Sequence, residues 1–432
     1  MRYVSTRGST RPETLGDALA AGLAPDGGLF VPEALPLFRT DAFSGREPLA
    51  TLAVGLLEPF FRGDALAPEL PAISSEALDI PLPMRAIAQR SWMLELFHGP
   101  TAAFKDFGAR FLAACLARMP AHGAPGQTVI AATSGDTGAA VAAAFHRKPG
   151  FRVVILYPEG RVSPRQAHQL GCFGDNVLAL RVAGSFDDCQ DLARRALADE
   201  SLKHKIALTT ANSISLGRLL PQMTYYAHAA FAHWLAHGRR LNFVVPTGNL
   251  GNALACVLAR STGLPVGDIV LATNANRVLP DYFDSGEYLP RTSVATLASA
   301  MDVGAPSNFE RLRWLYADDA ALRKALSAEA VDDDEIRDEI RVSRGRYGTL
   351  VCPHTATATR ALARLRERGD KRDFAVVATA HPAKFEAIIE PLIGAPVEIP
   401  PALAALLDRP AASEPLGVDY GALREHLLAP TA

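Results

Sequence analysis

The sequence predicts an α/β protein built on parallel strands that helices cover on both faces. From about residue 125, short runs rich in β-branched residues alternate with helical runs, and the strand-like runs are apolar along their whole length. Strands that are apolar on both faces are typical of parallel sheets, because helices bury both sides. The chain has 432 residues, 49% of them hydrophobic, which is enough for a large core in two or three domains.

The expected elements follow in chain order. The first hundred residues are rich in proline and loop-forming residues, for example APDGGLFVPEALP, and predict a separate N-terminal element. Apolar, β-rich runs predict strands over residues 128–133, 152–157, 177–182, 206–210, 242–245 and 374–379. Helices are expected over residues 139–146, 185–199 and 219–236, with Ser185 and Asp188 as a capping pair. The charge runs of residues 318–346 predict a solvated helical segment.

Composition and charge restrict the partners. Lys plus Arg 44 against Asp plus Glu 46 gives 44 − 46 = −2, and no basic block indicates nucleic acid or an anionic membrane. The five cysteines form no CxxC pair, so neither a disulfide framework nor a zinc site is indicated. The sequence shows no secretory signal and no apolar run of about 18 residues. We therefore expect a cytoplasmic protein that acts on small molecules and holds no metal.

Lys105 lies in the run LFHGPTAAFKDF, among phenylalanines, alanines and a proline. On a helix over residues 104–119 it falls at the edge of the apolar stripe, whereas Asp106 and Arg110 form an i,i+4 pair on the opposite, solvent-facing side. Most lone lysines of this kind extend to solvent. A desolvated lysine, however, has a lowered pKa and offers a free amine for Schiff-base chemistry.

Two glycine-rich turns follow predicted strands. SGDTG (residues 134–138) and GNLGN (residues 248–252) each stand between a strand and a helix, where free backbone N–H groups and the helix dipole favour an anion. Neither turn matches the GxGxxG or GxxxxGK[ST] signature of nucleotide sites. One such turn can be ordinary turn chemistry, but two of them beside an apolar-flanked lysine favour a ligand with anionic groups.

Nine segments, in order along nearly the whole chain, closely resemble the threonine synthase family of pyridoxal-phosphate enzymes. They are STRGST, DGGLFVP, LFHGPTAAFKDFGARF, ATSGDTGAA, LYPEGRVSP, TANSISLGRLLPQ, VPTGNLGN, ATNAN and TAHPAKF. The most specific parts are HGPTAAFKDF, SGDTG and TAHPAKF. The resemblance implies fold type II: two three-layer αβα domains, each with a mostly parallel sheet, plus an N-terminal element.

The resemblance also implies which residues hold pyridoxal phosphate. Lys105 would form the Schiff base with the cofactor and then move protons. The family's phosphate cup matches Gly248, Asn249, Leu250, Gly251 and Asn252. Thr379 matches the hydroxyl partner of the pyridine nitrogen. A hydroxyl, unlike an aspartate, does not hold that nitrogen protonated, so the ring is expected to be a weaker electron sink.

The substrate residues follow from the same resemblance. The loop that would bind the substrate's α-carboxylate consists of Ser134, Gly135, Asp136 and Thr137. Many fold type II relatives carry asparagine where Asp136 stands, and a carboxylate beside the ring's 3-oxygen would be repulsive unless one group is protonated. The set that would hold the substrate's phosphate is Asn212, Ser213 and Arg218. Arg218 suits this role because its planar guanidinium pairs phosphate oxygens bidentately.

The implied reaction converts O-phospho-L-homoserine and water into L-threonine and phosphate, which makes the chain a carbon–oxygen lyase. The alternatives are another fold type II lyase, a phospholyase, and a pyridoxal-phosphate carrier without turnover. His98 is either a structural loop residue or a substrate contact, whereas His354 and His381 are expected to orient the active-site loop. Tyr225 and Tyr226 fit a helix packing face.

The resemblance further implies a division of the chain. Residues 1–87 form the N-terminal element, and residues 106–220 form a smaller domain with the lysine helix and the SGDTG loop. Residues 88–105 and 221–432 form a larger domain with the phosphate cup and the TAHPAKF strand. The cofactor is expected between the two domains, in a monomer or a homodimer.

Overall fold

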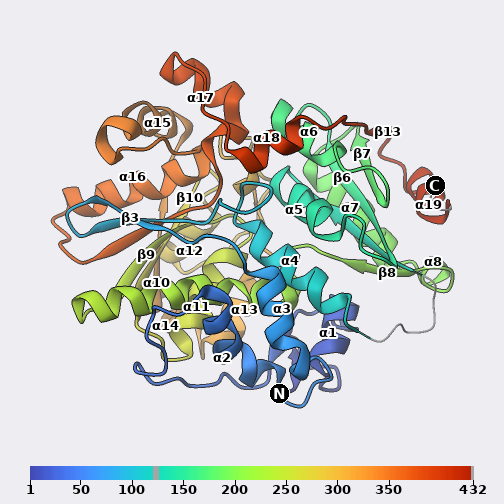
Figure 1. Cartoon of the computed structure of the whole chain (residues 1–432), viewed down its shortest axis with the longest axis horizontal. Helices are drawn as coiled ribbons and strands as arrows, with labels where there is room; N and C mark the ends of the chain where they lie inside the picture. Colours follow the sequence, from blue (N-terminus) through green and yellow to red (C-terminus); the bar gives the residue numbers. More distant parts are fainter. Residues whose placement is uncertain (120–125, 430–432) are drawn as a thin grey trace.

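Two sheets organise the chain in the computed structural model, which describes residues 1–119 and 126–429 (Figure 1). A five-stranded sheet has the order β13-β7-β6-β5-β8 and a six-stranded sheet the order β11-β10-β9-β12-β4-β3. The strands are β3 (Met84–Ala88), β4 (Ser91–Glu95), β5 (Gln127–Ala132), β6 (Phe151–Pro158), β7 (Val177–Val182), β8 (Ala207–Thr210), β9 (Leu241–Pro246), β10 (Val266–Thr273), β11 (Leu326–Ala330), β12 (Phe374–Ala378) and β13 (Glu414–Leu416). The α/β class is confirmed, and within these two sheets all the described strand pairs except β3–β4 are parallel.

Helices cover both faces of the five-stranded sheet. The four predicted strands over residues 128–210 are confirmed as β5 to β8. On one face Ile130 and Val154 pack with Leu192 of α7 (Phe186–Ala198) and Leu423 of α19 (Tyr420–Leu428). The opposite face packs against α4 (Lys105–Leu116), α5 (Asp136–Phe145) and α6 (Pro164–Gly171). The predicted cap of α7 is confirmed, because the Ser185 hydroxyl accepts from the Asp188 N–H.

The six-stranded sheet is covered in the same way. Val244 and Val270 face Ala361 of α16 (Pro353–Glu367), and Val245 and Leu271 face the main core. Helices α10 (Gln222–His237) and α11 (Gly251–Ser261) lie against that second face (Figure 1). The strands predicted over residues 242–245 and 374–379 are confirmed as β9 and β12, whereas β3, β4, β10 and β11 were not predicted.

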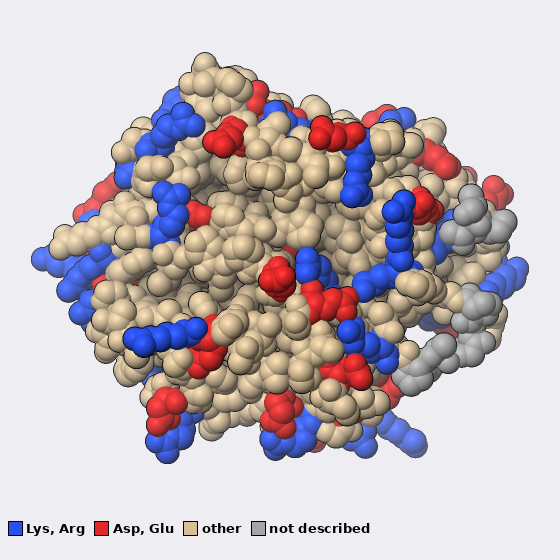
Figure 2. Space-filling model, viewed as in Figure 1, with Lys and Arg blue, Asp and Glu red and all other residues tan. Residues whose placement is uncertain are grey.

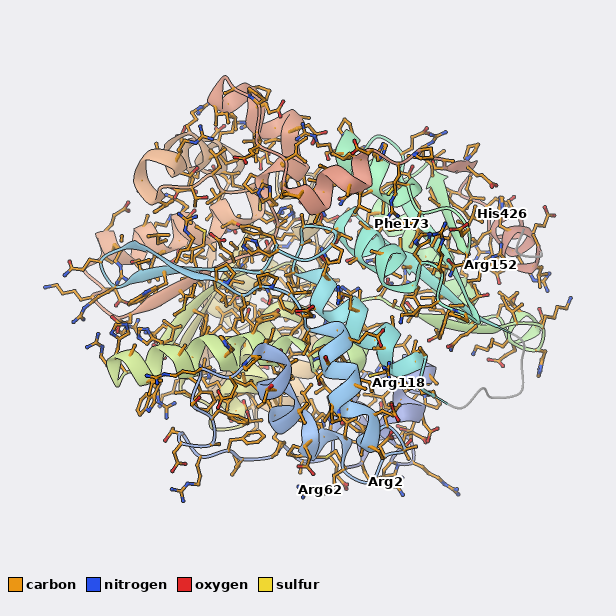
Figure 3. The ribbon with its side chains drawn as sticks, in the orientation of Figure 1. Arg2, Arg62, Arg118, Arg152, Phe173 and His426 are labelled. Carbon is orange, nitrogen blue, oxygen red and sulfur yellow. The ribbon has the colours of Figure 1, made fainter. Side chains whose placement is uncertain are left out.

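The N-terminal element is more helical and less separate than its composition predicts. It holds the antiparallel pair β1 (Tyr3–Ser5) and β2 (Phe30–Pro32) and the helices α1 (Leu15–Ala21), α2 (Leu49–Phe61) and α3 (Leu70–Ala77). Phe61 meets Phe111 of α4 edge-on at 6.1 Å. Arg118, just beyond α4, pairs with Glu76 of α3 at 2.8 Å (Figure 3). The apolar residues of α2 join the main core cluster, because their burial requires the rest of the chain.

The segment over residues 318–346 differs from the predicted solvated helix. It contains α14 (Asp319–Ala325), the strand β11, and α15 (Asp333–Tyr347). Strand β11 pairs in parallel with β10. One face of α15 buries Ile336 and Ile340 in a second core cluster. Most of the charged residues of this segment lie on its outer side, although Glu339 is buried. On the face in Figure 2, acidic and basic side chains are interspersed.

The C-terminal segment returns to the five-stranded sheet. After α17 (Glu386–Ile393) and α18 (Pro401–Leu407), the chain crosses to the strands at the right of Figure 1, where β13 pairs with β7. Arg152 of β6 donates to the carbonyl oxygens of His426 (2.7 Å) and Leu427 (3.0 Å), which fixes α19 beside it (Figure 3). This corrects the predicted division, which placed residues 221–432 together. Likewise β3, expected in the N-terminal element, lies in the six-stranded sheet.

The remaining helices connect these layers. They are α8 (Glu200–Lys203), α9 (Leu216–Leu219), α12 (Val278–Ser285) and α13 (Phe309–Leu315), with 3-10 turns at Ala67–Glu69, Ser299–Met301 and Pro382–Phe385. Among the helices of the described residues, none has the length and apolarity needed to cross a membrane.

Candidate active site

A cavity of about 440 Å³ lies where the carboxyl ends of both sheets meet. The turns after β5, β8, β9 and β12 all contribute to its wall, which is where parallel sheets hold their ligands. The predicted residues that line it are Lys105, Ser134, Asp136, Thr137, Asn212, Ser213, Arg218, Gly248, Asn249, Leu250, Gly251, Asn252 and Thr379. Gly135 lies in the same loop but does not line the cavity. Lys105 and Thr379, which are 379 − 105 = 274 residues apart in the sequence, are thus brought together.

Lys105 is the first residue of α4 and faces this cavity. Its position is set by the chain before it: Ala103 forms a β-bridge with Ala380, and the Phe104 N–H donates to the Thr379 carbonyl at 2.8 Å. Burial lowers the pKa of Lys105 to about 8. The charge of Asp136 raises this pKa, and the charges of Arg218 and Lys384 lower it further. An amine of this pKa is available as a nucleophile near neutral pH.

The predicted solvent-facing pair of Asp106 and Arg110 is wrong. Asp106 is buried at the start of α4, where it accepts from the Thr101 N–H (2.9 Å) and hydroxyl (2.6 Å). Arg110 instead donates to the carbonyls of Ala77 and Glu76. Helical periodicity placed Asp106 on the polar side, but the residues before the helix fold back over that side and bury it.

The turn after β9 forms a cup for an anion. A Cβ on Gly248 would stand 2.7 Å from the Cα of Met301, so the backbone can approach this closely only because the residue is glycine. Leu250, before the first residue of α11, has φ 63°, a left-handed conformation that is uncommon for a leucine. The first-turn N–H groups of α11 lack helical partners and lie at the cavity, as a phosphate requires.

Side chains hold the cup in place. Asn249 donates to the Ser213 hydroxyl at 2.7 Å, which joins the cup to the predicted substrate loop. Both Tyr225 and Tyr226 donate their hydroxyls to the Asn252 side-chain oxygen, at 2.5 and 2.8 Å. The two tyrosines are buried in the core, so the prediction that they form a packing face is confirmed.

Thr379 presents a buried hydroxyl that has no hydrogen-bond partner among the described residues. An unpaired polar atom of this kind is unfavourable unless a ligand completes it. Together with the deprotonatable Lys105 and the cup over residues 248–252, it fits the three ends of pyridoxal phosphate: aldehyde, phosphate and pyridine nitrogen. The residues present therefore fit this cofactor.

Asp136 is the first residue of α5 and lies beside Lys105 in the cavity wall. It pairs with Lys384 at 2.8 Å and accepts from Gln166 Nε2 at 2.9 Å. Burial alone would raise the pKa of Asp136, but the charges of Lys384, Lys105 and His354 outweigh it and hold the pKa far below its ordinary value. Asp136 is therefore a carboxylate. Lys384 was missed in the sequence, although it too stands among apolar residues in TAHPAKF.

Arg218 is 2% exposed and lies in α9, in the wall of the same cavity. Its Nη1 donates to the Ala211 carbonyl at 2.7 Å, whereas its Nε has no partner among the described residues. Burial lowers the pKa of Arg218 to about 10, partly offset by Asp106. A buried guanidinium with an unused donor is suited to a phosphate. Nearby, the side-chain oxygen of Asn212 is also buried without a partner in the described chain.

The histidines have structural partners. His98 contacts Glu95 at 2.7 Å and does not line the cavity. His354 lines it and accepts from the Ala300 N–H at 3.0 Å, and burial lowers its pKa to about 4. His381 accepts from the Ala383 N–H at 3.2 Å. Over residues 1–119 and 126–429 no group of three His, Cys, Asp or Glu side chains could hold a metal ion.

The fold and the site define a pyridoxal-phosphate enzyme of fold type II. Residues 81–382 match the family model "Pyridoxal-phosphate dependent enzyme". Residues 2–78 and 355–427 match the models of the threonine synthase N terminus and C-terminal region. The chain belongs to the threonine synthase family.

Individual relatives agree. The threonine synthase of Serratia marcescens is 37% identical over 430 residues, which is 99% of both chains. The crystal structure of threonine synthase from Escherichia coli is 37% identical, with TM-score 0.91 over 99% of both chains. The structure of pyridoxal-phosphate-bound threonine synthase from Brucella melitensis is 34% identical, with TM-score 0.90 over 99% of both chains. Maize serine racemase, 15% identical with TM-score 0.53 over 72% of this chain and 91% of its own, shares the fold alone.

Proposed function

We propose that the protein converts O-phospho-L-homoserine and water into L-threonine and phosphate with pyridoxal phosphate. Family membership supports this activity. The observation that carries it in the structure is a single cavity with Lys105 in its wall and two separate sites suited to phosphate, the cup over residues 248–252 and the buried Arg218. One phosphate site suits the cofactor, and the second suits a substrate that itself carries phosphate.

For the cofactor, Lys105 provides the covalent attachment, the cup binds the phosphate, and Thr379 bonds to the pyridine nitrogen. Bound pyridoxal phosphate supplies an electron sink that acidifies the bonds of the attached substrate carbon. The residue roles are supported by the lowered pKa of Lys105, by the unpaired hydroxyl of Thr379 and by the N–H groups at the start of α11.

For the substrate, the loop of Ser134, Gly135, Asp136 and Thr137 binds the α-carboxylate. Asp136 itself is paired with Lys384, so the donors for this carboxylate are the hydroxyls and the N–H groups at the start of α5. At the other end, Asn212, Ser213 and Arg218 bind the substrate's phosphate. The two ends orient the substrate along the cavity.

Two side chains carry the reactive steps that the protein itself performs. The free amine of Lys105 takes a proton from one substrate carbon and delivers that proton to another. Arg218 stabilises the negative charge that collects on the phosphate as it leaves. The buried position of both groups strengthens these interactions, because water screens them less there.

The division of the chain into domains is part of the proposal, with the corrections above. The N-terminal element precedes β3, a smaller domain carries the part of helix α4 that follows Lys105 and the SGDTG loop, and a larger one carries the cup and Thr379. The C-terminal strand and helix belong with the smaller domain. We also propose a monomer or homodimer in the cytoplasm. The five cysteines are all buried and free, which suits a reducing compartment.

The test measures phosphate and threonine released from O-phospho-L-homoserine by the purified protein with pyridoxal phosphate. We expect equal amounts of both, and neither from Lys105→Ala. A matched control, Lys203→Ala, changes an exposed lysine of α8 outside the cavity and should keep the activity. Phosphate with a 2-oxo acid in place of threonine would indicate a phospholyase, and full turnover by Lys105→Ala would exclude the proposed role of that lysine.

A further inference from the structure

Lys384 and Asp136 form a buried ion pair beneath the cavity. The Lys384 side chain is 0% exposed and that of Asp136 is 4% exposed, with 2.8 Å between Nζ and Oδ1. Removing two charges from water is unfavourable unless further hydrogen bonds satisfy the remaining donors and acceptors of the pair. Here Lys384 also donates to the Thr101 carbonyl at 2.7 Å, and Gln166 donates to Asp136. Asp136 lines the cavity, whereas Lys384 lies behind it.

The surroundings fix the Lys384 backbone. The Ser163 hydroxyl, at the N-terminus of α6, donates to the Lys384 carbonyl at 2.6 Å, and Arg165 donates to the Ala383 carbonyl at 2.8 Å. Gln169 of α6 reaches the same Thr101 carbonyl that accepts from Lys384, at 3.3 Å. The lysine therefore joins the 3-10 turn after β12, the start of α5 and the segment that leads into α4. An apolar side chain could fill this buried position, so packing alone does not explain the charge of Lys384.

The pair acts on Lys105 through charge. The groups that influence its pKa are Asp136, which raises it, and Arg218 and Lys384, which lower it. His354 also faces this centre and is neutral above its pKa of about 4. The carboxylate of Asp136 would hold the proton on Lys105 if no other cation neutralised it.

We propose that Lys384 is a positioning residue that neutralises Asp136 and thereby keeps the Lys105 amine free to attach the cofactor. The proposal rests on the proposed attachment at Lys105. In that step the Lys105 nitrogen adds to the aldehyde carbon of pyridoxal phosphate, a C=N bond forms, and the aldehyde oxygen leaves as water with the two protons of the amine. Only the unprotonated amine can begin it, so its rate reports the charge on Lys105.

The test follows covalent loading of the cofactor-free protein as a function of pH. Pyridoxal phosphate is added, samples are reduced with borohydride at intervals, and mass spectrometry measures the fraction modified at Lys105. For the unchanged protein we expect a rate that rises with a midpoint at about pH 8. Lys384→Met should move the midpoint up and Asp136→Asn should move it down, each by about 1 pH unit or more. The double variant should return toward the original midpoint.

Other titratable groups near Lys384 would not shift the loading midpoint in these opposite directions. His354 and His381 have pKa values of about 4 and stay neutral over a range of pH 6 to 10. Burial raises the pKa of Asp106, and the charge of Lys384 partly offsets this effect. Asp106 itself is kept in every variant. Arg346→Met is the control for a lost cation elsewhere, because Arg346 pairs with the buried Glu339 away from the cavity. This variant should lose stability and keep the loading midpoint.

The outcomes separate the inference from the proposed function. Midpoints of Lys384→Met and Asp136→Asn that equal the original, or that move in the same direction, would overturn the role of Lys384. If Lys384→Met does not fold, Lys384→Gln, whose amide can still donate to Asp136, is measured in its place. Asp136→Asn keeps the acceptor for Gln166 and tests the downward shift independently. Absence of any modification at Lys105 in the unchanged protein would instead refute the attachment itself.

Discussion

At the scale of single residues, the site is a set of buried charges that are incompletely paired by the protein. Among the described residues, Arg218 Nε, Thr379 Oγ1 and Asn212 Oδ1 have no hydrogen-bond partner. Lys105 has a pKa lowered to about 8 by burial. A buried donor such as Arg218 Nε is unfavourable while it lacks a partner and becomes favourable once a ligand supplies an acceptor. Three of the residues that we assign to binding therefore carry a buried polar atom that the described chain leaves without a partner.

Arg218→Met should reduce kcat/KM for O-phospho-L-homoserine about 10- to 100-fold. The reason is the loss of hydrogen bonds to a charged group, worth roughly 1.5–3 kcal/mol. Steady-state kinetics measure the change. Arg337→Met changes a half-buried arginine of α15 that pairs with Asp334 outside the cavity; it serves as the control and should leave the kinetics unaltered. Equal kinetics for both variants would contradict a phosphate-binding role for Arg218.

Thr379→Val should separate stability from binding. Valine keeps the shape but removes the unpaired hydroxyl, so the cofactor-free protein should gain about 1 kcal/mol in free energy of unfolding. Affinity for pyridoxal phosphate should fall about 5- to 10-fold, because one hydrogen bond is lost. Urea unfolding and equilibrium titration measure the two quantities. Unchanged affinity would show that this hydroxyl does not meet the cofactor.

At the scale of elements, the site depends on how closely α4 and α9 pack. A Cβ on Gly108 would stand 2.8 Å from the carbonyl oxygen of Arg218. This glycine lets the helix of Lys105 approach the helix of Arg218, so the two functional side chains share one cavity. Such contacts between elements follow from the tertiary structure, and no local pattern around Gly108 reveals them.

Gly108→Ala should destabilise the protein by about 1–3 kcal/mol, because the helices must separate. Gly345→Ala is the matched control: it lies in α15, where a Cβ would meet no atom within 4 Å. There, alanine should raise the free energy of unfolding by roughly 0.5–1 kcal/mol through its higher helix propensity. Denaturant unfolding measures the free energy of unfolding of both variants. A Gly108→Ala protein as stable as its parent would refute the close packing of α4 and α9.

The predicted elements succeed or fail for local reasons. Strands β5 to β9 and β12 are continuous apolar runs between turns, so their pattern predicts them. Strand β10 was missed because Gly267 and Asp268 interrupt its start, at a point where its register against β9 shifts. Strand β11 was read as helix, since LSAEA consists mostly of helix formers. Its pairing with β10 overrides that propensity.

At the scale of the whole molecule, the ends of the chain complete the layers. The C-terminal segment adds β13 beside β7 and packs Leu416, Leu423 and Leu427 on one face of the five-stranded sheet. The N-terminal helices cover α4 from the other side. Both ends therefore stabilise the layers formed by α4 and the five-stranded sheet, although they are more than 300 residues apart.

Removal of residues 413–432 should lower the free energy of unfolding by more than about 3 kcal/mol. Three buried leucines are lost, each worth roughly 1.5–3 kcal/mol, and the edge of β7 is exposed. Thermal unfolding and light scattering detect the loss and the resulting aggregation. Val418→Ala, an exposed position in the same segment, should stay within about 0.5 kcal/mol of the parent. Equal stability of the truncated and full chains would contradict this account.

The sequence by itself determined the α/β class, most central strands, the family, and many of the residues that line the cavity. It could do so because strand patterns, glycine turns and short motifs are local properties of the chain. Only the tertiary structure decided that Asp106 is buried, that Lys384 neutralises Asp136, and that the C-terminal strand joins the sheet beside β7. These features arise from contacts between distant segments. Burial and charge pairing depend on all the neighbours of a group, and a linear pattern does not contain them.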